Sequence, residues 1–124
     1  MSVLNFEEIT HELNYEEEFK IVPIIVNRFK SNQGKEKIVT NKKMIEGIQK
    51  DCGFKTTEPR IRKMIQYIRD KNLLNDLEIL ATSKGYYSTD DNDEILKWIK
   101  SMNNRINAMI ETKDSVELRL MKKQ

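Results

Sequence analysis

Residues 56–74, TTEPRIRKMIQYIRDKNLL, gather side-chain types that contact nucleic acids. Between Phe54 and Lys71 six cations stand against two acids, a local charge of +4. Arginine pairs bidentately with guanine in the major groove, glutamine reads adenine, and threonine or tyrosine holds phosphates. If the isoleucines and the methionine face a core, the outward side presents Thr57, Arg60, Arg62, Lys63, Gln66, Tyr67 and Arg69. The pattern favours contact with a DNA groove over its alternative, an ordinary solvated helix surface.

Further cations flank this stretch in the sequence. Lys84 stands in the turn SKG between two β-prone runs, where a lysine can reach a phosphate or the minor groove. Any polar residue suits an exposed turn, so the sequence favours neither a DNA contact by Lys84 nor an ordinary turn residue at this position. Lys42 and Lys43 begin a predicted helix just after Lys35 and Lys37, and such helix N-termini commonly meet phosphates. These residues predict a basic surface that extends beyond residues 57–71.

The charge of the chain is unevenly distributed. The whole chain carries +2, yet residues 1–22 contain six glutamates against one lysine, a local charge of −5. The remainder therefore carries +7. A basic remainder next to an acidic N-terminal segment favours a nucleic-acid partner. The alternative is the ordinary variation of charge along a soluble chain.

Composition and length restrict the class of protein. The 124 residues fit one domain, and 38% hydrophobic with 34% charged residues fits a helix-rich, soluble protein with a small core. No run approaches the ~18 apolar residues of a membrane span, and the N-terminus has acids where a signal peptide has cations. A single cysteine excludes an internal disulfide and favours a reducing compartment. We therefore expect a cytoplasmic protein with no membrane partner.

The residues that commonly carry catalysis are sparse. His11 is the single histidine and lies among glutamates, while Cys52 occupies an apolar helix position and is expected to be a packed thiol. Cysteine–histidine catalysis would require these two to meet beside an orienting third group. The sequence has no Cys/His cluster for zinc and no Gly-rich phosphate loop. We therefore expect no enzyme activity, no metal and no cofactor.

The first helix is predicted over residues 15–30. Asn14 and Glu17 have the spacing of a capping box, and Phe19, Val22, Val26 and Phe29 recur at helical spacing. Pro23 interrupts this pattern, because an interior proline loses a hydrogen bond and clashes with the preceding turn. Either the helix kinks there, or Pro23 starts the main helix and residues 15–21 form a separate turn.

Two shorter helices and a hairpin are predicted next. Thr40 is expected to cap a helix over 41–52 that stops at Gly53, and Thr57 a second helix that stops near Asn72. A helix pair joined by a glycine-containing turn is a helix-turn-helix candidate. The run DLEILATSKGYYST then predicts two strands around SKG, in which Leu77, Ile79 and Ala81 alternate inward.

A last helix is predicted from residue 91 to about 121, opened by Asp90. Apolar residues recur in this helix at alternating spacings of four and three residues, which gives a heptad seam interrupted only by Lys113. Its apolar positions are Ile95, Ile99, Met102, Ile106, Met109, Val116 and Leu120. The seam predicts a second copy, or another partner, along this helix. The alternative is that residues 95–102 pack on the domain while the rest frays as a charged tail.

The order of these elements resembles a winged helix-turn-helix. Residues 36–88 resemble the winged-helix domains of bacterial and phage regulators, including biotin-operon repressors, in which a strand ending in GY follows a cation-rich helix. The stretches RIRKMIQYIRDKNLL, LATSKGYY and DEILKWIKSMNNRI resemble, over residues 36–110, small winged-helix proteins encoded by bacterial viruses. The resemblance implies duplex-DNA binding and a role in phage replication or transcription control.

We accordingly expect a mainly α protein with a small β-hairpin (α+β), arranged as a winged helix-turn-helix with a long C-terminal helix. Residues 1–14 would form an acidic segment, 15–90 the winged-helix domain and 91–124 a long, dimerising helix. The expected function is binding of duplex DNA by a homodimer in the cytoplasm of a bacterial host cell, through residues 57–71 and the wing at 77–88. The alternative is a phage protein-interaction module that uses the same fold to bind a host protein, such as a replication protein.

Overall fold

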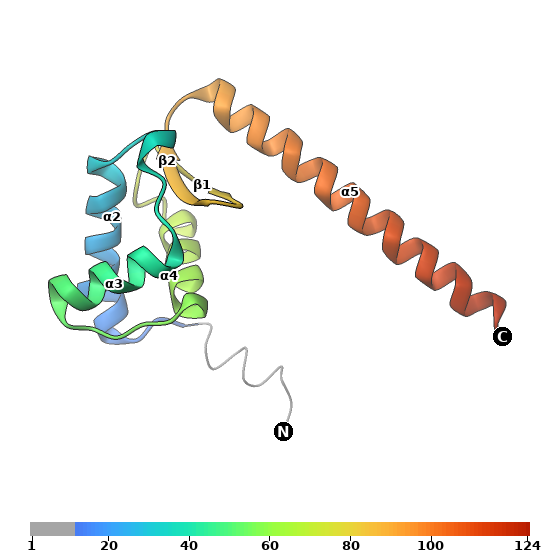
Figure 1. The fold of residues 1–124 in the computed structure, drawn as a ribbon, viewed down its shortest axis with the longest axis horizontal. Helices are drawn as coiled ribbons and strands as arrows, with labels where there is room; N and C mark the ends of the chain where they lie inside the picture. Colours follow the sequence, from blue (N-terminus) through green and yellow to red (C-terminus); the bar gives the residue numbers. More distant parts are fainter. Residues whose placement is uncertain (1–11) are drawn as a thin grey trace. The chain divides into compact units, whose positions relative to one another are not determined.

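The computed structural model describes residues 12–124, and the chain divides into one unit ending at Asp90 and a second spanning Asp91–Gln124. The elements are η1 (Glu17–Ile21), α2 (Val22–Ser31), η2 (Lys35–Lys37), α3 (Asn41–Cys52), α4 (Glu58–Asp70), β1 (Glu78–Thr82), β2 (Gly85–Thr89) and α5 (Asn92–Lys122). The predicted class is confirmed: the fold is mainly helical with one antiparallel hairpin, in the order of a winged helix (Figure 1). Residues 1–11, with His11 and most of the predicted acidic segment, lie outside the described residues.

The predicted capping box is present at the start of the first helical segment. The Glu17 amide donates to Asn14 Oδ1 at 2.8 Å, and the Asn14 amide donates to Glu17 Oε1 at 3.0 Å. The segment then continues as the π-helix η1, in which the Val22 amide donates to the Glu17 carbonyl. A π turn is wider than an α turn, so it changes which side chains face inward. Glu17 and Ile21 are buried, whereas Phe19 is 59% exposed and its predicted place in the buried stripe is wrong.

Pro23 lies in the first turn of α2, directly after the π turn. Pro23 stands at the start of the α2 segment, as the second sequence interpretation expects, but residues 15–21 are not a separate turn, because they lead into α2 with right-handed helical dihedral angles at Ile21 and Val22. A proline is tolerated in a first turn because its missing N–H would have no α-helical partner there. The inner side of α2 then carries Val22, Ile25 and Phe29 into the core.

The helices α3 and α4 form the predicted helix–turn–helix pair. The Thr40 hydroxyl accepts from the Lys43 amide at 3.1 Å, and Gly53 ends α3 with a left-handed φ of 72°, so both predicted ends are confirmed. Thr57 occupies the N-cap position of α4, but its hydroxyl makes no capping hydrogen bond. The predicted inner stripe of α4 is at most 1% exposed, and its members are Ile61, Met64, Ile65 and Ile68.

The hairpin pairs β1 with β2 in antiparallel register, with Thr82 opposite Gly85 across a two-residue turn. A third segment pairs with β2 through an isolated antiparallel bridge, in which Val39 and Tyr86 exchange two backbone hydrogen bonds of 2.8 Å each. Ile79 is buried as predicted, but Leu80 on the other side of β1 is buried too, at 2% exposure, whereas Ala81 is only half-buried. Both sides of the first strand are therefore covered.

One core joins the three helices to the hairpin. Side chains from α2, α3, α4 and β1 pack together with Val39, Leu74 and Tyr86. The fully buried Ser88 hydroxyl donates to the Phe29 carbonyl at 2.6 Å, which ties β2 to the last turns of α2. This core holds α4 and the hairpin in one fixed arrangement.

The second unit is the single helix α5, about 46 Å long at 1.5 Å per residue. Asp91 is its N-cap, one residue later than predicted, and its carboxylate accepts from the amides of Asp93 at 2.9 Å and Glu94 at 3.4 Å. Among the described residues, no helix combines the length and the apolar character needed to cross a membrane.

Candidate nucleic-acid interface

The outward side of α4 carries a short polar surface. Arg62 and Gln66 are exposed and Lys63 is half-exposed, all opposite the buried stripe of the same helix. The Gln66 side-chain amide donates to Asp70 Oδ1 at 2.8 Å, an exposed contact one turn along the helix. Within residues 12–124 no salt bridge involves Arg62 or Lys63. These side chains can therefore meet an incoming anion without first breaking an ion pair with any of residues 12–124.

Arg60 is held inside the fold. Its Nε donates to Glu17 Oε2 at 2.8 Å, its Nη2 contacts Glu17 Oε1, and Nη2 also donates to the Glu12 carbonyl at 3.0 Å. The Glu17 side chain is only 6% exposed and that of Arg60 22%. Arg60 therefore anchors the first turn of α4 to η1, a role that its place among the predicted DNA contacts did not anticipate.

Protonation of Glu17 is coupled to this ion pair. Burial raises the pKa of the Glu17 carboxyl, but it is outweighed by the hydrogen bonds from Arg60 and the Asn14 amide and by the charge of Arg60. The net pKa lies below its ordinary value, so the carboxylate stays ionised at neutral pH. The Glu17 hydrogen bond also raises the pKa of Arg60.

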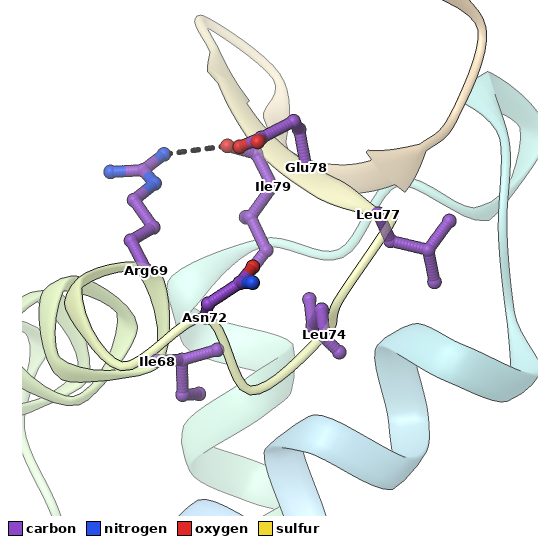
Figure 2. A pocket seen from close by; sticks show the side chains of 7 residues that line it. All are labelled: Ile68, Arg69, Asn72, Leu74, Leu77, Glu78 and Ile79. Atoms are coloured by element: carbon purple, nitrogen blue, oxygen red, sulfur yellow. Dashed lines mark hydrogen bonds between the residues drawn. The ribbon is translucent and has the colours of Figure 1, made fainter.

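Arg69 connects α4 to the wing. Its Nη2 donates to the backbone carbonyl of Ile79 in β1 at 2.7 Å, as Figure 2 shows. The residues around this contact enclose a hollow of about 30 Å³, which is large enough for a water molecule and too small for a ligand. Arg69 thus fixes the hairpin against the C-terminal half of α4, and part of its donor capacity is used within the protein.

Tyr67 lies toward α2. It borders a hollow of about 300 Å³ together with Phe19, Pro23, Val26 and Leu73, and the Lys71 ammonium lies 6.0 Å from its ring centroid. Tyr67 is therefore half-buried on a different side of α4 from Arg62 and Gln66. Of the residues predicted on this helix, Arg62, Lys63 and Gln66 lie on the side away from the core, and Tyr67, one turn after Lys63, borders the hollow toward α2.

The N-terminal ends of α3 and α4 meet. The Asn41 side-chain amide in the first turn of α3 donates to Glu58 Oε1 in the first turn of α4 at 3.3 Å. Lys42 and Lys43 belong to the same turn as Asn41 and both are exposed. Thr57, the exposed N-cap of α4, immediately precedes Glu58. The structure thus places predicted phosphate contacts at the paired helix ends, where free amides favour anions.

The wing contributes one cation at its tip. Lys84 is exposed in the two-residue turn, and its amide donates to the Thr82 hydroxyl at 3.1 Å, while that hydroxyl donates to the Gly85 carbonyl at 2.9 Å. A Cβ on Gly85 would lie 2.5 Å from the Val39 carbonyl oxygen, so the glycine is needed for the close approach of two backbones. The turn holds Lys84 at the end of an ordered hairpin.

Net positive charge concentrates in the part of the first unit that follows the acidic residues 1–22. Residues 23–90 contain 14 Lys and Arg against eight Asp and Glu, a net charge of +6. Residues 91–124 contain seven against six, a net charge of +1. With the −5 of residues 1–22 included, the unit Met1–Asp90 has a net charge of +1, so the positive charge lies in the part of that unit that carries the helix–turn–helix pair and the hairpin.

The predicted seam lies along α5. Ile99, Ile106, Met109, Val116 and Leu120 are between 43% and 71% exposed, and Ile95 and Met102 are half-buried. Lys113 within the seam is bound to its own helix, with Nζ 2.7 Å from Glu117 Oε1 and 2.9 Å from Asp114 Oδ1. The hydrogen bonds with Glu117 and Asp114 raise the pKa of Lys113.

Within the described residues no three His, Cys, Asp or Glu side chains gather as metal ligands. Cys52 is half-buried, packs against the core and donates through Sγ to the Ile48 carbonyl at 3.0 Å. These observations describe an ordinary packed thiol.

Comparison with known proteins identifies no relative: no family model, curated protein sequence or solved structure matches this chain.

Proposed function

We propose that this protein binds duplex DNA as a winged helix-turn-helix, with α4 in the major groove and the β1–β2 hairpin beside it. The observation that carries the proposal is the outward side of α4, where Arg62, Lys63 and Gln66 lie together on a helix held rigidly by the core. Arginine and glutamine on such a helix suit guanine and adenine edges. Lys42, Lys43 and Lys84 would add phosphate contacts around it.

The proposal includes a second copy of the chain. The exposed seam of α5 is too long an apolar stripe to remain in water without a partner. Two copies would present two α4 helices to DNA, as dimeric helix-turn-helix proteins do. Together with the resemblance to small viral winged-helix proteins, this supports a role in replication or transcription control of a bacterial virus, in the cytoplasm of its host.

A binding titration tests this function. Fluorescence anisotropy with a labelled duplex at several salt concentrations should give log affinity that falls with log salt, because bound cations release counterions from the phosphates. The double variant Arg62→Ala, Lys63→Ala should bind more weakly and lower the slope by roughly one for each lost phosphate contact. Lys84→Ala should have a smaller effect, since an exposed single contact is heavily screened.

A charge-matched control separates specific contact from general attraction. Arg28→Ala, Lys30→Ala removes the same two charges from exposed positions of α2. We expect this control to bind nearly as tightly as the parent protein. If both double variants bind equally well, or if no binding is seen at low salt, α4 is not a DNA-reading helix.

A second candidate function is recognition of a protein. It is favoured by the exposed pair of Tyr15 and Phe19, whose ring centroids are 4.9 Å apart, next to the hollow between α2 and Tyr67. Exposed aromatic side chains beside an apolar hollow are typical of protein interfaces. Such a module of a phage would bind a host protein with little dependence on salt, which distinguishes it from the first proposal.

A further inference from the structure

The apolar seam of α5 has a polar interruption at one place only along its eight positions. From Ile95 to Leu120 it extends about 38 Å, with Lys113 as the sixth position. The Lys113 ammonium is already paired with Asp114 and Glu117 of its own helix. Any arrangement of two α5 helices must therefore accommodate a lysine stem in the seam and leave its charged end at the edge.

A parallel pair of helices meets this requirement poorly. In a parallel, in-register coiled coil each seam position faces itself in the other copy. Lys113 would face Lys113, so two ammonium groups would share one layer between the Met109 and Val116 layers. Like charges brought together in a partly dehydrated layer repel, and the repulsion would oppose association.

An antiparallel pair removes this conflict. With the two seams fully overlapped, Ile95 faces Leu120, Ile99 faces Val116, Met102 faces Lys113 and Ile106 faces Met109. Met102 is unbranched and adaptable, so the lysine stem can pack against it while the ammonium stays with Glu117. All eight seam positions then have a partner, and no layer contains two charges.

The flanking positions agree with the same arrangement. Trp98 of one helix would lie beside Arg119 of the other, where a guanidinium can stack on an indole. Arg105 would lie beside Thr112, and Asn103 beside Ile110. No flanking pair brings like charges together.

We propose that two copies of the chain associate through antiparallel α5 helices in this register. The proposal rests on the second copy included in the proposed function and adds its orientation. Since each α5 follows directly on the first unit of its own copy, an antiparallel pair attaches the two first units to opposite ends of a rod about 46 Å long. Each copy would then bring its α4 helix to DNA from its own end of the rod.

Disulfide formation tests the orientation. In a Cys52→Ser background, Ile99→Cys and Val116→Cys are prepared separately, oxidised alone and as a mixture, and the linked peptides are identified by mass spectrometry. The antiparallel register brings residues 99 and 116 of different copies together, whereas a parallel pair holds them about 26 Å apart. A disulfide requires Cα atoms within roughly 7 Å, so the mixed 99–116 product should exceed either self-linked product at least about tenfold.

Controls keep the result interpretable. Lys122→Cys lies away from the seam and should not form a mixed disulfide efficiently with Ile99→Cys. Sedimentation equilibrium on the Cys52→Ser protein should show a dimer before oxidation. Self-linked products from both single variants, or a monomer at high micromolar concentration, would overturn the proposal. This experiment contains no DNA, so neither result bears on DNA binding by α4, which the binding titration tests separately.

Discussion

The carboxylate of Glu17 and the guanidinium of Arg60, 43 residues apart in the chain, form a largely buried ion pair that joins η1 to the first turn of α4. Glu17 also completes the capping box with Asn14, so one side chain serves both a local and a long-range contact. The position of the proposed DNA-reading helix therefore depends on a glutamate of the acidic N-terminal region.

Replacing Arg60 with alanine should destabilise the fold. The change leaves the Glu17 carboxylate buried without its counter-charge, and breaking a buried pair from one side costs about 3 kcal/mol. Lys63→Ala, on the same helix but in no salt bridge among residues 12–124, should change the free energy of unfolding by less than about 0.5 kcal/mol. Urea denaturation measures both. Equal losses for the two variants would contradict the anchoring role of Arg60.

The same ion pair makes stability depend on pH. Because the pKa of Glu17 is lowered in the folded protein, the unfolded chain binds its proton first as the pH falls. The stabilisation is fully present above the ordinary glutamate pKa of about 4.3 and is lost as the pH falls through the lower folded value. Glu17→Gln keeps a capping side chain at this position but removes the charge. Its stability deficit should be present at pH 7 and shrink toward pH 3; a constant deficit would exclude this linkage.

Gly85 should not accept a side chain. It has a φ of 132°, and an added Cβ would lie 2.5 Å from the Val39 carbonyl oxygen. Gly85→Ala is therefore expected to cost about 3 kcal/mol or more in the free energy of unfolding. Gly47→Ala is the matched control, since a Cβ there meets nothing within 4 Å and alanine favours a helix interior by about 0.5–1 kcal/mol. Thermal unfolding should move in opposite directions for the two variants.

Lys113→Leu should strengthen association of α5. The substitution makes the seam apolar at every position from Ile95 to Leu120, so the dimer dissociation constant should fall by roughly tenfold or more. Lys97→Leu places the same side chain outside the seam and should leave the constant nearly unchanged. Sedimentation equilibrium on the intact chain gives both values. A constant that falls equally in both variants would indicate nonspecific apolar association instead of a seam.

Local chemistry in the sequence determined most of the secondary structure. The capping box at Asn14, the cap at Thr40, the end at Gly53 and the turn at Lys84 were all predictable, because each depends on residues within a few positions. The buried stripe of α4 was predictable for the same reason, since helical periodicity alone identifies the inner side. The seam of α5 likewise follows from spacing.

Tertiary packing decided which polar groups remain outside. Arg60, Arg62 and Arg69 look alike in the sequence, yet Arg60 binds Glu17 and Arg69 binds the Ile79 carbonyl, leaving Arg62 exposed. Such partners come from distant segments, and periodicity carries no information about which side chain meets them. The π turn that leaves Phe19 exposed was not predicted either, because the spacing of the apolar residues was read with the α-helical period alone. The sequence thus determined which side of each helix is apolar and which is polar. The tertiary structure decided which charged side chains on the polar side remain exposed.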